Sequence, residues 1–151
     1  MSRVSDSLIW QVVKNNNSFL HKREQTARSG AVQFSAESGN LMNVNSFKYS
    51  GLANSKTVDI SSDEANRVYL KTKAPRKSNA PRKNVATTPL RKDRTRSEKV
   101  VKSRGCSSFY RSDLSAAAKI KYNKTLRDAR VRAGIVKAAR SKIGPRNNRT
   151  A

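Results

Sequence analysis

A basic segment between residues 71 and 104 constrains the fold of this chain more than any other stretch. Its 34 positions hold 13 Lys and Arg residues, 2 acidic residues and three prolines, Pro75, Pro81 and Pro89, with almost no hydrophobic periodicity. Such a composition buries too little apolar surface to offset the entropy lost on ordering. Each proline also biases the residue before it toward extended geometry. We therefore expect an extended basic strap, disordered alone and ordered beside a polyanion.

The charge distribution divides the chain around this segment. Residues 1–70 hold 8 Lys+Arg and 6 Asp+Glu, a net of +2, and residues 71–151 hold 25 and 4, a net of +21, which together give +23. A chain with this charge needs a polyanionic partner, and nucleic acid fits best. We predict a small globular domain at 1–70, the basic strap at 71–104, and a basic helix with a tail at 105–151.

The first seventy residues show mixed helix and strand patterns. Ser5 or Asp6 can cap a short helix that runs to about Lys14. Segments with strand-like patterns then alternate with turn-rich gaps, at residues 18–23, 32–34, 46–49, 57–60 and 68–71. These patterns predict an α+β fold, in which a small antiparallel sheet carries a helix on one face.

Helical periodicity returns after the strap. A short helix is expected from Arg94, ended by Gly105, and a long one after Ser112, which is a good N-cap. The long helix has a narrow apolar stripe with spacings of three and four residues: Leu114, Ala118, Tyr122, Leu126, Ala129, Ala133 and Val136. This stripe suits close packing on a protein or RNA surface.

Residues with catalytic or metal-binding chemistry are sparse. His21 is the only histidine, Cys106 is the only cysteine, and Asp63-Glu64 is the only adjacent acidic pair. No nucleophile stands beside a base, and no glycine-rich phosphate loop or metal-ligand cluster occurs. We therefore predict no enzymatic activity, no metal, no cofactor and no small-molecule substrate.

The aromatic residues of the first part allow two interpretations. Phe19, Phe34 and Phe47 can stack on bases, but a globule this small favours them as core residues. Tyr49 and Tyr69 are amphipathic and neighbour lysines, so we expect them to be more open.

The cellular location is also constrained. The lone Cys106 fits a reducing compartment, and no apolar run is long enough to span a bilayer. The N-terminal sequence lacks the hydrophobic core of a signal peptide. We expect a protein of the cytosol or nucleus without membrane contact.

Several strings resemble one known family, the eukaryote-specific large-subunit ribosomal proteins conventionally numbered twenty-eight. They are LIWQVVKN at 8–15, SFL at 18–20, NSFKYSGL at 45–52, KTV at 56–58, and YRSDL at 110–114 with AAA at 116–118. The family usually has proline where Ser112 stands, and the strap matches mainly in composition. The resemblance implies a structural constituent of the cytosolic large subunit, with nuclear and nucleolar transit during assembly. It also implies large-subunit ribosomal RNA and neighbouring ribosomal proteins as partners.

The cations of the strap and the long helix are the predicted RNA-binding residues, because cations neutralise phosphates where RNA segments repel. They are Lys71, Lys73, Arg76, Lys77, Arg82, Lys83, Arg91, Lys92, Arg94, Arg96, Lys99, Lys102, Arg104, Arg111, Lys119, Lys121, Lys124, Arg127 and Arg130. The alternative is a nucleolar assembly factor that shares the N-terminal module. That family carries cysteines there, and residues 1–70 have none. A chromatin or non-specific DNA-binding protein is a third class that the composition permits.

Overall fold

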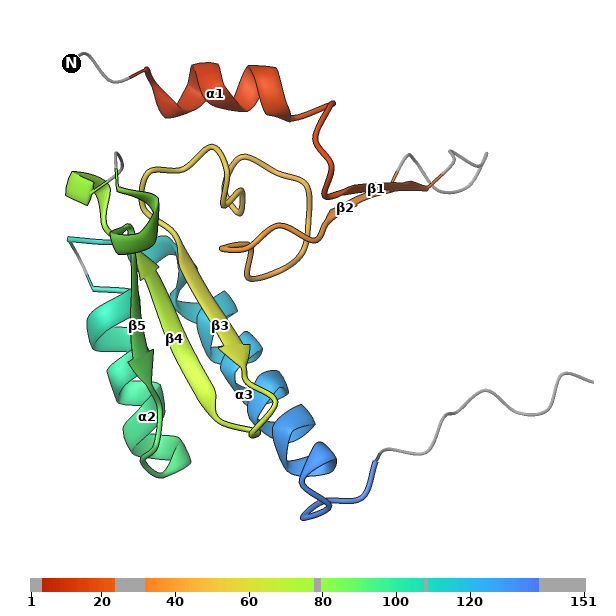
Figure 1. Cartoon of the computed structure of the whole chain (residues 1–151), viewed down its shortest axis with the longest axis vertical. Helices are drawn as coiled ribbons and strands as arrows, with labels where there is room; N and C mark the ends of the chain where they lie inside the picture. Colours follow the sequence, from red (N-terminus) through yellow and green to blue (C-terminus); the bar gives the residue numbers. More distant parts are fainter. Residues whose placement is uncertain (1–3, 24–31, 78–79, 108, 139–151) are drawn as a thin grey trace, which may run out of the picture.

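A computed structural model of the chain describes residues 4–23, 32–77, 80–107 and 109–138. It is a mixed α+β structure, as predicted, with three α-helices and five strands in the described part (Figure 1). The order is α1 (Asp6–Val13), β1 (Leu20–Arg23), β2 (Val32–Ser35), β3 (Val58–Ser62), β4 (Val68–Lys73), β5 (Val85–Pro89), α2 (Arg94–Val100) and α3 (Ser115–Arg132). Single turns of 3-10 helix at Pro75–Lys77, Pro81–Lys83 and Ser112–Leu114, and a π-turn at Val101–Gly105, complete the set.

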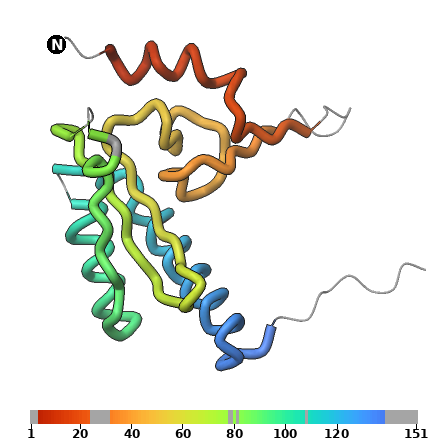
Figure 2. Tube along the Cα trace, viewed as in Figure 1, coloured from red at the N-terminus to blue at the C-terminus, as the bar shows by residue number. Residues whose placement is uncertain are grey.

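The strands form two antiparallel sheets rather than the single one predicted. The first, β1–β2, is a two-stranded ribbon that projects from the body of the molecule (Figures 1 and 2). The second has the order β3-β4-β5, with Ile60 opposite Leu70 and Leu70 opposite Thr88. Residues 46–49, predicted as a strand, form turns instead.

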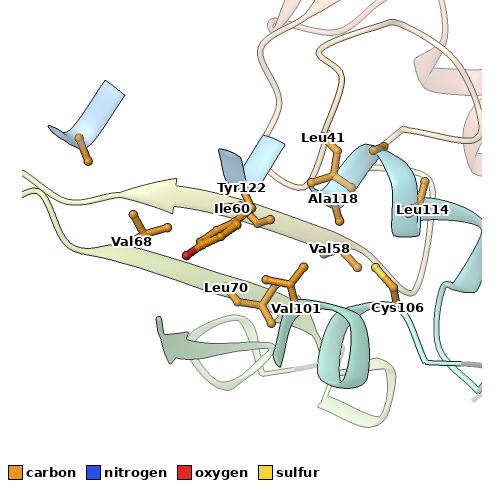
Figure 3. Packing of buried hydrophobic residues seen from close by; sticks show 12 residues of the cluster. Leu41, Val58, Ile60, Val68, Leu70, Val101, Cys106, Leu114, Ala118 and Tyr122 are labelled. Atoms are coloured by element: carbon orange, nitrogen blue, oxygen red, sulfur yellow. The ribbon is translucent and has the colours of Figure 1, made fainter. Parts of the chain in front are cut away.

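The hydrophobic core lies between the three-stranded sheet and the C-terminal helices. Val58, Ile60 and Leu70 alternate along β3 and β4 and are almost completely buried. Tyr122 of α3 and Val101 of the π-turn meet them from the helical side (Figure 3). Each such apolar side chain contributes about 1.5–3 kcal/mol relative to an exposed one. This core therefore joins residues that sequence analysis assigned to three successive regions.

The apolar stripe predicted on the C-terminal helix faces this core. Leu114, Ala118, Tyr122 and Ala129 are buried, and Leu126 packs against them. The helix ends at Arg132, because Gly134 adopts a positive φ of 71° just beyond it. Ala133 and Val136 therefore lie outside the helix, contrary to the prediction. Ser112 is also not the N-cap: it begins a 3-10 turn, and α3 starts after Leu114.

The segment 71–104 contains more regular structure than the extended strap that its composition predicted. Its first residues belong to β4, and the rest supplies β5 and α2. Pairing with β4 satisfies the backbone groups along one side of β5, and this ladder does not depend on apolar side chains. Leu90 and Val101 then supply apolar contacts to the common core. The predicted short helix that ends at Gly105 is confirmed, with α2 continuing into the π-turn.

The prediction that the phenylalanines form the core was wrong. Phe19, Phe34 and Phe47 are 42%, 48% and 39% exposed. The physical reason is that no second layer among the described residues covers the ribbon, and Phe47 instead meets Trp10 of the exposed helix α1. The core is filled by aliphatic residues of β3 and β4 and by α3. The predicted helix over residues 5–14 is confirmed as α1, capped by the Ser5 hydroxyl. It does not cover a sheet face, however, because none of its residues is buried.

Helix α1 instead rests on the loop that follows β2. The Trp10 and Phe47 ring centroids lie 6.1 Å apart. The backbone N–H of Ser55 donates to Asp6 Oδ2 at 2.9 Å, and Asn45 Nδ2 donates to the carbonyl of Lys14 at 2.9 Å. These contacts place the N-terminal helix beside the ribbon, at the end of the molecule opposite the C-terminal end of α3 (Figure 1).

Tyr110 and Arg111 tie the start of the C-terminal region to the N-terminal loops. The Tyr110 hydroxyl lies 2.9 Å from the carbonyl of Thr57 and 2.7 Å from that of Lys73, and it accepts from Thr57 N at 3.2 Å. Burial raises the pKa of this hydroxyl above its ordinary value, and the surrounding backbone hydrogen bonds only partly oppose the shift. The neutral hydroxyl is therefore the form that the fold stabilises.

The Arg111 guanidinium makes a second junction next to it. It donates to the carbonyls of Lys48 at 2.6 Å and Lys56 at 3.0 Å, and it forms a two-point ion pair with Asp113 at 2.9 and 3.0 Å. The hydrogen bond from Arg111 lowers the pKa of Asp113, although partial burial opposes it. One cation thus fixes three separate backbone segments.

Candidate nucleic-acid interface

A groove between α2 and α3 gathers cations from both helices. Its volume is about 370 Å³, with Val101 and Tyr122 among its apolar lining residues. Lys99 and Lys102 come from α2 and its π-turn, and Lys119 comes from the first half of α3. All three lysines are exposed, so their ammonium groups can reach an anion that enters the groove. The fold therefore brings together three of the predicted RNA-binding residues.

Glu98 is the single carboxylate among the groove residues, and it organises the cations around it. Its Oε1 lies 3.2 Å from Arg94 Nε, and its Oε2 lies 3.5 Å from Lys119 Nζ. Desolvation would raise the pKa of Glu98, but the Arg94 hydrogen bond and the Lys119 charge outweigh it and lower the pKa. Glu98 thus stays ionised and links α2 to α3 through a cation on each helix.

Further cations lie along the exposed edge formed by β5 and its flanking turns. The turns before β5 carry Arg76, Lys77, Arg82 and Lys83, and the chain after it carries Arg91, Lys92 and Arg96, all of them exposed. Arg104 reaches back to this strand, with Nη1 3.4 Å from Thr88 Oγ1. The exposed cations of α3 beyond the groove are Lys124, Arg127 and Arg130. Most predicted RNA-binding residues are therefore accessible on the surface.

Four predicted RNA-binding residues are only partly exposed. Lys73 Nζ donates to the carbonyls of Gly51 at 3.3 Å and Asn54 at 3.1 Å, and Arg111 is held by the contacts described above. Lys71 lies opposite Asp59 on the sheet face that α3 does not cover, and Lys121 lines a second cavity beside β3. The side chains of Lys73 and Arg111 therefore hold loop backbone in place within the protein.

The single cysteine and histidine stand apart from this groove. Cys106 is a free, buried thiol, and burial together with the Asp113 charge raises its pKa. His21 is exposed on β1. Within the described ranges, no three His, Cys, Asp or Glu side chains gather where they could hold a metal ion, and no helix has the length and apolar character needed to cross a bilayer.

Comparison with known proteins identifies the family. The Ribosomal L28e protein family matches residues 8–128, which include every described helix and strand except α1's first two residues and α3's last four. The chain belongs to the ribosomal L28e protein family. It is accordingly a ribosomal protein, which agrees with the resemblance seen in its sequence.

Relatives from three eukaryotes carry the name large ribosomal subunit protein eL28. The Caenorhabditis elegans protein is 39% identical over 118 residues, which cover 78% of this chain and 88% of that protein. The Dictyostelium discoideum protein is 35% identical over 116 residues, covering 76% and 81%. The Schizosaccharomyces pombe protein is 40% identical over 81 residues, covering 53% and 58%. The match therefore extends over most of the first two proteins.

Two exposed cations on β1 of this L28e-family chain were not among the predicted RNA-binding residues. Lys22 and Arg23 lie on β1, far from the basic segment in sequence. The run His21-Lys22-Arg23 was a visible signal for them, but the nearly neutral charge of residues 1–70 hid it. Charge averaged over seventy residues does not report a local cluster.

Proposed function

We propose that this protein is a structural constituent of the large ribosomal subunit that binds folded ribosomal RNA through phosphate contacts. The observation that carries the proposal is the gathering of exposed cations on β5, α2 and α3 around the groove of Lys99, Lys102 and Lys119. Family membership and the names of the relatives support the subunit. Neighbouring ribosomal proteins are the expected protein partners.

The proposed mechanism is electrostatic rather than catalytic. RNA phosphates that approach one another repel, and a rigid protein surface with spaced cations lowers that repulsion. Because α2 and α3 are held together by the core and by Glu98, the groove lysines are positioned before RNA arrives. Such contacts recognise the position of phosphates and the shape of the RNA rather than its sequence.

The test is the salt dependence of binding between the full chain and large-subunit ribosomal RNA. Replacing Lys99, Lys102 and Lys119 together by Gln should reduce the slope of log affinity against log salt. The reduction should be about 0.7–0.9 for each phosphate that the variant no longer neutralises. Circular dichroism of the variant checks that the fold is retained.

A matched control removes the same charge from the N-terminal part, by replacing Lys14, Lys48 and Arg67 with Gln. We expect its slope to differ from that of the parent by less than the equivalent of about one neutralised phosphate. Equal slopes for the groove variant and the control would contradict the groove as a phosphate site.

Cellular fractionation tests the proposed subunit role. We expect the protein on translating cytosolic ribosomes at moderate salt, after passage through the nucleolus during assembly. Restriction to nuclear pre-ribosomal particles would instead support the assembly-factor alternative.

A further inference from the structure

Within the described residues, the β1–β2 ribbon has one face that makes contacts and one that is open. On the contacting face, Lys22 Nζ donates to the carbonyl of Asn15 at 3.1 Å. Gln33, which pairs with Lys22, accepts from Asn45 Nδ2 at 2.7 Å. Since side chains alternate along a strand, His21 and Arg23 lie on the opposite face. The ribbon is thus anchored through one face and presents the other.

The open face centres on an aromatic ring. Phe34 pairs directly with His21 across the ribbon and forms a bridge with Val44 on its other side. Its side chain is 48% exposed although it stands in the middle of three adjacent backbone segments. A phenylalanine at such a position has a backbone strand on each side and a ring that solvent can reach.

A second exposed ring stands close by. Phe19 precedes β1, and its carbonyl extends the ladder by accepting from the N–H of Ala36 at 2.9 Å. Continued alternation along this ladder puts Phe19 on the side of His21. Phe19 is 42% exposed, so this side of the ribbon carries two partly exposed phenylalanines, Phe19 and Phe34.

Charge indicates the kind of partner that covers this face. Neither strand contains an acidic residue, whereas β1 carries His21, Lys22 and Arg23, all of them exposed. Aromatic rings beside cations on a strand surface suit an unstacked nucleotide, whose base stacks while its phosphate pairs with a cation. A purely apolar protein surface would leave the Arg23 charge desolvated.

We propose that the open face of the ribbon is a base-stacking site, in which Phe34 receives an unpaired RNA base and Arg23 contacts the adjoining phosphate. His21 and Phe19 border the stacked base. The site rests on the proposed function and deepens it, because the groove between α2 and α3 recognises phosphates alone. It adds a preference for RNA that has an unstacked nucleotide.

The test compares the full chain and its variants on two RNA probes of the same composition, an unstructured single strand and a duplex. Stacking on one base corresponds to about 5- to 150-fold in affinity. Phe34→Leu keeps an apolar side chain without the π face, and it should lose this factor on the single strand only. Phe34→Trp should bind within about threefold of the parent chain.

Phe109→Leu is the matched control, because Phe109 is 90% exposed but lies outside the ribbon. Its affinity for the single strand should equal that of the parent. Equal losses in both leucine variants, or equal loss on the single strand and the duplex, would overturn the stacking site. If Phe34→Leu proves poorly folded, Phe34→Val, which suits a strand, should show the same selective loss.

The salt slope separates this proposal from the phosphate proposal. If the affinity of the parent chain depends steeply on salt and Phe34→Leu binds the single strand as tightly as the parent, the stacking proposal alone is refuted. A shallow slope in the parent chain would refute the phosphate proposal.

Intact large subunits that contain the chain provide a second measurement. Ultraviolet irradiation should join a nucleotide to the peptide that carries Phe34. A neighbouring protein cross-linked to the peptide that carries Phe34, without a nucleotide adduct there, would reassign the face to a protein partner.

Discussion

The hydroxyl of Tyr110 makes the sharpest test of how this fold is held together. Its oxygen contacts the carbonyls of Thr57 and Lys73 at 2.9 and 2.7 Å and accepts from Thr57 N at 3.2 Å. It therefore joins the start of β3 and the end of β4 to the segment that leads into α3. Tyr110→Phe removes the hydroxyl and leaves the ring in place.

The free energy of unfolding should fall by about 1–3 kcal/mol in this variant. The reason is that the N–H of Thr57 and the carbonyls of Thr57 and Lys73 lose a partner that water does not fully replace. For a domain of this size the melting temperature should fall by about 3–12 °C. Thermal and urea unfolding followed by circular dichroism measure the change. Tyr69→Phe is the control, because Tyr69 lies on the face of the three-stranded sheet that α3 does not cover. It should lower the free energy of unfolding by less than about 0.5 kcal/mol.

The direction of the Tyr110 pKa shift predicts how the stability difference between the parent and Tyr110→Phe changes with pH. The folded pKa of Tyr110 is raised above the unfolded value of about 10, so the fold favours the neutral hydroxyl. Its contribution is complete below that unfolded value and is lost as the pH rises through the folded pKa. The stability difference between the parent and Tyr110→Phe should therefore shrink above about pH 10. Equal melting temperatures at neutral pH, or a difference that grows with pH, would refute the reasoning.

Three further predictions concern the rest of the fold. Gly51→Ala should destabilise the protein by about 3 kcal/mol or more in urea unfolding, because the new Cβ would lie 2.0 Å from the carbonyl oxygen of Ser38. Asp113 has a lowered folded pKa, so its pairing with Arg111 stabilises above about pH 4 and fades as the pH falls; Asp113→Asn should flatten this part of the acid-unfolding profile. Cys106, whose pKa is raised by burial, should react with iodoacetamide in urea much faster than in the native protein.

The sequence predicted those elements whose signals are local. Helix α1 follows from the Ser5 cap and the apolar pairs after it, and α3 follows from its alanine-rich stripe. Gly134 marks the end of α3 more accurately than the stripe does, because its backbone takes a left-handed conformation there. Periodicity alone therefore overestimated the helix by one turn.

The pairing of β5 with β4 was not predicted, because composition says nothing about a neighbouring strand. Residues 85–89 have few apolar side chains, yet the edge of β4 offers them a ladder of backbone partners. That edge is a tertiary feature, which a count of charges and prolines cannot reveal. The groove could be predicted in part, since its lysines were named, but the pairing of α2 with α3 through Glu98 could not.

The phenylalanines show a different limit. A small globule was expected to bury every large apolar group, so Phe34 was assigned to the core. The chain instead fills its core with aliphatic residues of β3 and β4 and with Tyr122. Which face of a ribbon is covered depends on the loops around it. Here the hydrogen bond between Asn45 of the loop and Gln33 of β2 marks the covered face, and the sequence does not show that contact.

The position of α3 also has a consequence for the order in which the protein can fold. Leu70 and Tyr122 are core neighbours separated by 52 residues of chain. At about 5–20 residues per second, the ribosome needs about 3–10 s to make the intervening segment. A hairpin of β3 and β4 forms within microseconds, so its apolar face must wait uncovered for its helix. The nascent chain therefore passes through a period in which the core residues of β3 and β4 are exposed unless a chaperone covers them.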